Sequence, residues 1–282
     1  MDNRELALER INKSINRKEI DLDTKNNVVM ANRMILHTAS NLTLDEVKLL
    51  RCMIMQVEKD DEELFEFKIP AADFADVLGV KKKDLYKKLD TMTTHIMQEV
   101  IRIADDDKKR WKKFHWVDIC EYDQGTMYIK LSEKLKPFLL DLKGSFTKYE
   151  LNEIIRLNSV YGIRIYEIIR SYMNDHDLPY ADHKNEISIS MDVLRKATNT
   201  ENKFSRPYDF KRKVIDIAVR EINRCSKYHV IAEPYKNGKT VIGYDFIIES
   251  QAGYAVRQQT TEEEQIDGQL TLDDFLKNNT NN

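Results

Sequence analysis

The fold of this chain is decided by residues 207–225, which read PYDFKRKVIDIAVREINRC. Pro207 suits the first turn of a helix, where its missing N–H has no partner to lose. Apolar residues then recur at the spacing of one helix face: Phe210, Val214, Ile217, Ala218 and Ile222. Residues 229–235 and 240–248 alternate as two strands around Lys236-Asn237-Gly238-Lys239, an Asn-Gly turn signal. A long basic helix followed by a β-hairpin is the layout of a winged helix-turn-helix.

The residues before this helix complete one such domain. Ile187 and Ile189 predict a short strand, and residues 191–197 predict a short helix. Further upstream, Thr147-Lys148-Tyr149-Glu150 has the spacing of a capping box, which predicts the start of a helical hairpin that runs to about residue 173. We therefore place the second domain at residues 144–250.

The first half of the chain repeats this order. A capping box at residues 43–46 predicts a helix to about residue 58, and Phe65, Phe67 and Ile69 predict a short strand. A short helix over 71–78 and a long one over 81–98 follow, the latter with the apolar stripe Leu85, Leu89, Met92 and Ile96. Strands are predicted over 100–104, 114–121 and 127–131, with a tight turn at 123–125. The predicted fold is α+β, with two tandem winged-helix domains, the first spanning residues 26–143.

The two ends of the chain differ from these domains in composition. Residues 1–25 are polar and predict a mobile segment, with a frayed helix around residues 6–15. Residues 251–282 are rich in Gln, Thr, Glu and Asn and predict a disordered acidic tail. No apolar run predicts a membrane span or a signal peptide, and Cys52, Cys120 and Cys225 lie far apart, as reduced thiols of a cytoplasmic protein do.

Charge is distributed unevenly along the chain. The formal net charge is −3, but residues 203–239 hold ten Lys/Arg against four Asp/Glu, and residues 81–113 hold eleven against six. Duplex binding depends on the charge of the face presented, not of the whole molecule. Each patch alone is also compatible with a solvated helix face. Two patches at matching positions of matching domains favour contact with duplex DNA.

The start of the 207–225 helix holds the best candidates for base contact, since a recognition helix enters the major groove with its N-terminal residues nearest the base edges. These candidates are Arg206, Arg212 and Lys213. Other cations are placed to bind phosphates: Lys81, Lys82, Lys83, Lys87, Lys203, Arg220, Lys236 and Lys239. The lysines of the first half indicate backbone contact more than base readout. The charged stretch over 105–110 is either a further backbone contact or a solvated turn.

Motifs for catalysis or cofactors are weak. Gly238-Lys239-Thr240 resembles the end of a phosphate-binding loop, but Glu233 stands where the first glycine belongs and the context is a hairpin. The histidines form no His–apolar–His pair, and Asp175-His176-Asp177 beside Pro179 fits a solvated loop better than a metal site. We therefore expect no enzyme activity, no cofactor and no metal.

The acidic tail carries one apolar cluster: Gln269, Leu270, Leu272 and Phe275. It resembles the Gln-Leu-x-Leu-Phe peptides with which bacterial proteins bind the replicative sliding clamp, although Asp273 stands at the aromatic position. The alternative is an incidental amphipathic end.

Several segments resemble plasmid replication initiators of the Rep_3 family. They are residues 149–151 and 163–172, DFKRKV at 209–214, REIN at 220–223, VMAN at 29–32 and Leu42-Thr43. The resemblance covers about residues 26–249. It implies a theta-type initiator whose second domain reads the iteron repeats of the origin, with Arg206 and Arg212 at the positions of the family's base-contacting arginines.

The resemblance also implies partners and regulation. Monomers would bind iterons and open the origin, dimers joined through the first domain would repress the initiator's own gene, and host initiator and helicase proteins would be recruited. A winged-helix transcriptional repressor and a non-enzymatic replisome-assembly adaptor are the alternatives. Sequence-specific binding distinguishes an initiator from an adaptor, and origin melting distinguishes it from a repressor.

Overall fold

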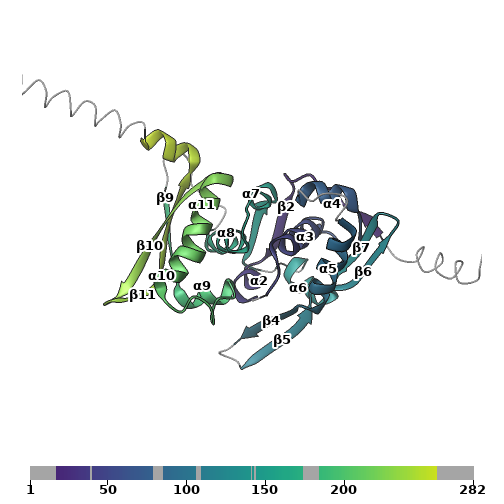
Figure 1. Cartoon of the computed structure of the whole chain (residues 1–282), viewed down its shortest axis with the longest axis horizontal. Coiled ribbons are helices and arrows are strands. Elements are labelled where there is room, and N and C mark those ends of the chain that lie inside the picture. Colours follow the sequence, from purple (N-terminus) through teal and green to yellow (C-terminus); the bar gives the residue numbers. More distant parts are fainter. Residues whose placement is uncertain are drawn as a thin grey trace, which may run out of the picture.

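The computed structural model describes residues 17–38, 40–78, 85–105, 109–140, 142, 144–173 and 184–258. Lys81, Lys82 and Lys83, the predicted helix at 6–15, the histidine-bearing loop at 175–183 and the apolar cluster at 269–275 lie outside the described residues. One hydrophobic core runs through both halves of the described chain, which pack side by side (Figure 1).

The first half contains a four-stranded sheet with the order β1-β3-β7-β6. Its strands are β1 (Arg17–Glu19), β3 (Glu66–Pro70), β7 (Thr126–Leu131) and β6 (Val117–Asp123). Gln124 and Gly125 join β6 to β7 with φ values of 43° and 87°, the left-handed pair of a type I′ turn, so the predicted turn is confirmed. β1 pairs with β3, so residues 17–19 belong to the sheet although we placed them in a mobile segment.

The helices of the first half include α2 (Asn32–His37), α3 (Leu44–Met55), α4 (Ala71–Leu78) and α5 (Leu85–Gln98), of which α4 contacts β3, α5 contacts β6, and α2 contacts α8 (Val160–Tyr172) and α9 (Met191–Ala197) of the second half. The capping box predicted before α3 is confirmed, since the Thr43 N–H donates to Glu46 Oε2 at 2.7 Å. The helix ends at Met55, earlier than predicted. The apolar stripe predicted on α5 is buried throughout.

A two-stranded arm projects from the first half, formed by β4 (Val100–Asp105) and β5 (Arg110–His115) (Figure 1). We predicted a single strand over residues 114–121, and this is wrong. Trp116 is buried and its carbonyl accepts from the Ser132 N–H at 2.9 Å, which bends the chain between β5 and β6. The arm therefore leaves the sheet, and the cationic residues of β5 are exposed along it.

The second half has a three-stranded sheet with the order β10-β11-β9, packed against helices. The strands are β9 (Lys184–Ser190), β10 (Tyr228–Asn237) and β11 (Thr240–Ser250), and the helices are α7 (Asn152–Ile155), α8 (Val160–Tyr172), α9 (Met191–Ala197), α10 (Pro207–Phe210) and α11 (Asp216–Cys225). The short helix predicted over 191–197 is confirmed. Residues 251–258, assigned by us to the disordered tail, are helical, and the Tyr254 ring stacks on His229 at a centroid distance of 3.5 Å.

The capping box predicted at residues 147–150 is wrong. These residues form β8 (Phe146–Glu150), which pairs antiparallel with β2 (Asn27–Ala31). Thr147 and Tyr149 are buried while Phe146 and Lys148 are exposed, so the stretch has the period-two burial of a strand. The α8 helix begins instead after Ser159, whose Oγ accepts from the Gly162 N–H at 2.9 Å. Because this ladder crosses the boundary that we placed at residues 143–144, that boundary stays a prediction.

A buried charged cluster, which we call the Glu167 cluster, connects α3, α8 and β8. Arg51 donates to Glu167 from Nε at 2.6 Å and from Nη2 at 3.1 Å, and the Tyr149 hydroxyl donates to Glu167 Oε1 at 2.6 Å. Arg164 donates to Glu167 at 3.1 Å, to the Ile35 carbonyl at 2.7 Å and to the Ala197 carbonyl at 2.9 Å. Burial alone would raise the pKa of Glu167, but Arg51, Arg164 and Tyr149 outweigh it and hold the pKa below its ordinary value.

Candidate nucleic-acid interface

Residues 207–225 are helical throughout, as the sequence predicts. The helix consists of α10, a π-helical turn η4 (Lys211–Ile215) and α11. Arg206 is the N-cap residue, with φ −75° and ψ 131°, and Pro207 occupies the first turn. The π turn was not predicted, and such turns occur often at functional sites.

The buried face of this helix differs from the prediction at one position. Phe210, Val214, Ala218 and Ile222 are buried as expected, but Ile215 is buried in place of Ile217, which is only half-buried. A π turn adds one residue to the helical repeat, so the apolar positions shift past it. The turn therefore explains why Ile215, and not Ile217, faces the core.

The helix at residues 207–225 holds the place of the recognition helix in a winged helix-turn-helix, and we call it by that name. The loop before it is fixed by Arg195 of α9. Its guanidinium donates to the carbonyls of Thr200, Lys203 and Phe204 at 2.8 to 3.0 Å and lies 4.6 Å from the centroid of the Phe210 ring. Phe204 has a φ of 53°. The short helix, the loop and the start of the recognition helix are thus held as one unit.

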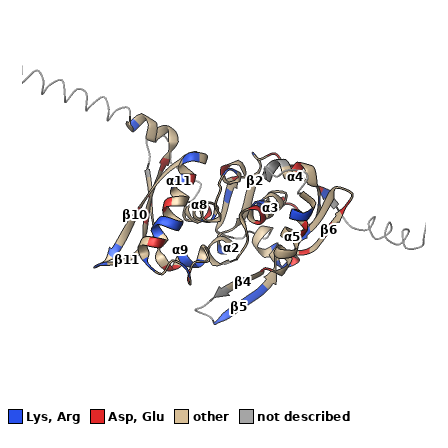
Figure 2. Cartoon of the chain, in the orientation of Figure 1, with Lys and Arg blue, Asp and Glu red and all other residues tan. Residues whose placement is uncertain are grey.

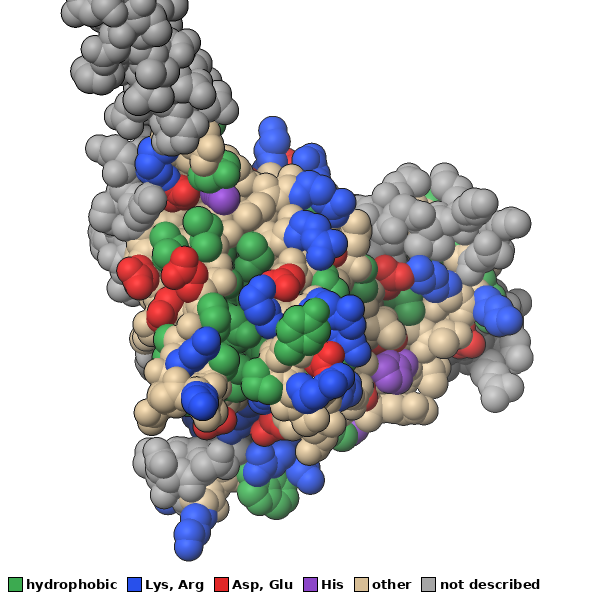
Figure 3. All heavy atoms as spheres, turned by 60° about the vertical axis from the view of Figure 1, so that its left-hand side comes forward, with side chains coloured by type: hydrophobic (Ala, Val, Ile, Leu, Met, Phe, Trp, Pro, Cys, Tyr) green, Lys and Arg blue, Asp and Glu red, His purple; other side chains and the backbone are tan. Residues whose placement is uncertain are grey.

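All three residues predicted to contact bases are exposed at the start of this helix. Arg206 pairs with Asp209 at 2.7 Å and its side chain is 79% exposed. The Arg212 guanidinium lies 6.0 Å from the Tyr208 ring centroid, and Lys213 Nζ lies 5.1 Å from that of Phe204. Cation–ring contacts orient these long side chains without neutralising them. Lys and Arg side chains gather on this face of the molecule (Figure 3).

The wing that follows ends in two exposed lysines. β10 and β11 pair from Tyr228 opposite Ser250 to Asn237 opposite Thr240. Lys236 and Lys239 lie at the tip of this hairpin (Figure 2). Asn237 pairs with Thr240, so the loop is Gly238-Lys239, with Gly238 at φ 60°. Glycine with positive φ at the first loop position is typical of a type II′ turn, so the Asn-Gly turn that we predicted is displaced by one residue.

The remaining predicted phosphate contacts are spread over both halves. Lys203 is exposed in the loop before the recognition helix, Arg220 is exposed on that helix, and Lys87 is exposed on α5. Lys88, its neighbour, pairs with Asp45 instead.

Our sequence reasoning missed two exposed features. Tyr208 is 69% exposed on the recognition helix between Arg206 and Arg212, and Trp111 is 61% exposed on the arm between cationic residues. The helical or strand period assigns both positions to solvent. An aromatic residue at a solvent-facing position is the sequence signal that could have marked them as contact residues.

Among the described residues, no three His, Cys, Asp or Glu side chains form a group that could hold a metal ion. All three cysteines are free, and burial raises the pKa of Cys52 to about 12, so this thiol stays protonated. None of the helices within the described residues has the length and apolar character that a membrane span needs.

Comparison with known proteins gives the family. Residues 27–170 match the family described as Initiator Replication protein, WH1, and residues 190–248 match Initiator Rep protein, WH2. The chain belongs to the Rep_3 family of replication initiators. Each Rep_3 match covers one of the two winged-helix layouts, with the first match extending through most of α8.

Two relatives illustrate the similarity. The PI protein of Escherichia coli is 25% identical over 143 residues, which is 45% of the chain and 45% of that protein. A solved structure described as Pi initiator protein in complex with iteron DNA has 21% identity and a TM-score of 0.65, covering 82% of the chain and 99% of that structure. At this level of identity the structural match establishes a shared fold.

Proposed function

We propose that this chain initiates plasmid replication by binding repeated sequences at the origin through its second winged helix. The observation that carries the proposal is the exposed cationic face formed by the start of α10, the η4 turn and the wing tip. The chain that carries this face belongs to a family of replication initiators. Its fold is shared with a protein whose structure is described in complex with iteron DNA.

The roles within this face follow from geometry and charge. Arg212 is the strongest candidate for base contact, because its guanidinium is exposed and forms no ion pair within the described residues. Arginine pairs bidentately with guanine and discriminates by about 1–3 kcal/mol per good contact. Arg206 must break its ion pair with Asp209 before it can contact a base. Lys213 carries a point charge and lacks the bidentate geometry of arginine. Lys203, Arg220, Lys236 and Lys239 would bind phosphates, as would Lys87 and Lys81–Lys83 in the first half.

Assembly completes the proposal. The chain would dimerise through its first half and repress its own gene as a dimer. It would recruit host initiator and helicase proteins in the cytoplasm, with residues 269–275 as a candidate contact to the sliding clamp. Opening of the duplex would come from bending and protein assembly without a catalytic step.

The test is a titration of the purified chain against the DNA upstream of its own gene and against a scrambled duplex, at two salt concentrations. We expect about a thousandfold or greater preference for the native repeats. Equal and steeply salt-dependent binding to both duplexes would refute specific readout and favour the assembly adaptor. Specific binding without strand opening of a supercoiled origin would favour the transcriptional repressor.

A further inference from the structure

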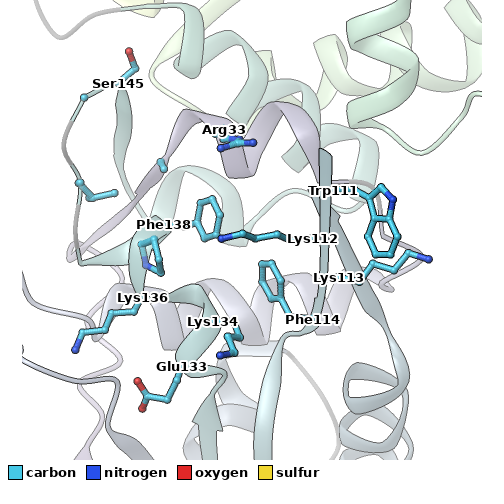
Figure 4. A pocket seen from close by; sticks show the side chains of 14 residues that line it. Arg33, Trp111, Lys112, Lys113, Phe114, Glu133, Lys134, Lys136, Phe138 and Ser145 are labelled. Atoms are coloured by element: carbon cyan, nitrogen blue, oxygen red, sulfur yellow. The ribbon is translucent and has the colours of Figure 1, made fainter. Parts of the chain in front are cut away.

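A second cationic surface lies away from the recognition helix, in a cleft at the base of the arm. The cleft has a volume of about 940 Å³ and lies between β5, the start of α2, the η2 (Glu133–Leu135) and α6 (Lys136–Leu139) turns, and residues 142, 144 and 145. Figure 4 shows Lys112 and Phe114 pointing into it from β5, with Phe138 opposite and Arg33 above. We call it the arm cleft.

The charge of the arm cleft is strongly one-sided. The described residues that line it include five cations, Arg33, Lys112, Lys113, Lys134 and Lys136, and one carboxylate, that of Glu133. Glu133 already pairs with Lys130 at 3.0 Å. Arg33, Lys112 and Lys134 form no ion pair within the described part of the chain. Cations gathered without counter-charges create a positive potential that attracts an anionic ligand.

The interior of the arm cleft is aromatic. The rings of Phe114 and Phe138 are half-buried and stack with a centroid distance of 6.1 Å and an interplanar angle of 17°. Because these two rings stack on each other, each has at most one face left for a nucleic-acid base. An aromatic floor below a cationic rim fits a peptide that carries both apolar and acidic side chains.

The chain itself contains such a peptide. Residues 259–282 hold six Asp or Glu and one Lys, and within them residues 269–276 read QLTLDDFL. We propose that the arm cleft binds this segment of the chain's own C-terminal region. Leu272 and Phe275 would contact the phenylalanine floor, and Asp273 and Asp274 would pair with the cationic rim. Where a flexible linker spans its two sites, a tethered segment has an effective concentration in the millimolar range, so weak intrinsic affinity suffices. This proposal is independent of sequence-specific DNA binding by the second half of the chain.

The experiment compares two full-length chains, the wild type and the variant Asp273→Lys/Asp274→Lys. A fluorescent peptide of residues 266–278 is titrated with each chain, and its anisotropy is followed. We expect the peptide to bind the variant at least about tenfold more tightly than the wild type, because the intact tail of the wild type occupies the cleft.

Further substitutions in the variant chain locate the site. Lys112→Glu and, on another element, Lys134→Glu should each weaken peptide binding about tenfold. Lys59→Glu is the matched control, since it makes the same charge change at an exposed site that does not line the arm cleft, and it should leave binding unchanged. Circular dichroism identifies any variant that fails to fold.

Several outcomes would overturn the proposal. They are a peptide that binds neither chain, equal binding to both chains, and equal losses from Lys59→Glu and the two cleft substitutions. A single-stranded oligonucleotide that binds with the same dependence on Lys112 and Lys134, where the peptide does not bind, would assign the cleft to nucleic acid instead.

Discussion

Arg212 and Lys239 are both exposed cations, yet their positions predict different effects on binding. Arg212→Ala, at the start of the recognition helix, should cost about 1–3 kcal/mol on the native repeats and relax the preference at one base pair. Lys239→Ala, at the wing tip, should weaken binding to every duplex alike and reduce the slope of log K against log salt by about one unit. Binding titrations on native and single-substituted repeats measure both effects. If the two variants lost the same affinity on cognate and random DNA, the assignment of base and phosphate roles would be wrong.

Residue type and spacing predicted which cations of the second half are exposed, because helical period alone separates Arg212 and Lys213 from the buried positions. They did not predict how these side chains are held. The Arg206–Asp209 ion pair and the rings of Tyr208 and Phe204 depend on the turn into the helix, which Arg195 fixes from another element. Contacts of this kind need the three-dimensional fold.

One glutamate of α11 holds the start of α8, and it should reverse the usual effect of replacing a helical glycine by alanine. Glu221 of α11 accepts from the N–H groups of Asn158 and Ser159 at 3.1 Å each and from the Ser159 hydroxyl at 3.0 Å, at the start of α8. A Cβ on Gly162 would collide with Glu221 Oε2. Alanine in a helix interior is normally favoured over glycine by about 1 kcal/mol. Here Gly162→Ala should instead lower the free energy of unfolding, by about 1–3 kcal/mol, because it displaces a charged acceptor from its donors.

Urea denaturation of a double-mutant cycle checks this prediction. In a Glu221→Ala background the nearer obstacle is gone and only Ser159 Oγ, at 3.2 Å, has to give way, so Gly162→Ala should cost much less than in the wild type. A destabilisation of the same size in both backgrounds would show that Glu221 is not the cause.

The elements themselves were largely predictable where local signals agree with packing. The short helices at residues 71–78 and 191–197 and the capping box before α3 are set by nearby residues. Residues 147–150 carry the same capping-box letters, but the antiparallel partner at residues 27–31 makes them a strand. Likewise, burial of Ile215 in place of Ile217 follows from a π turn that the apolar spacing of the helix does not specify.

At the scale of the molecule, the Glu167 cluster connects segments from the whole chain. Arg51 comes from α3, Tyr149 from β8, and Arg164 bridges the carbonyls of Ile35 and Ala197. Because Glu167 and Arg51 are buried, removing one partner leaves an uncompensated charge away from water. The sequence does not predict this cluster, because its side chains come from residues up to 116 positions apart and each of these residue types is also common on solvated surfaces.

Glu167→Gln should therefore lower the free energy of unfolding at pH 7 by about 3–5 kcal/mol, the range for a broken buried pair. The effect should depend on pH. The pKa of Glu167 is lowered in the folded chain, so its ionised form stabilises the fold above the ordinary carboxyl range near pH 4.5, and this stabilisation is lost as the pH falls through the folded pKa. The difference between wild type and Glu167→Gln should shrink on acidification below about pH 4.5.

Urea denaturation at pH 7, 5 and 4 measures this difference, with Glu63→Gln as the matched control. Glu63 is exposed, so its replacement should change the free energy of unfolding by less than about 0.5 kcal/mol at each pH. A loss for Glu167→Gln that stayed constant down to the acid limit of folding would mean that packing, and not the ionised carboxylate, holds these elements together. A loss that shrinks with acid would identify the Glu167 charge as the link between the two winged helices.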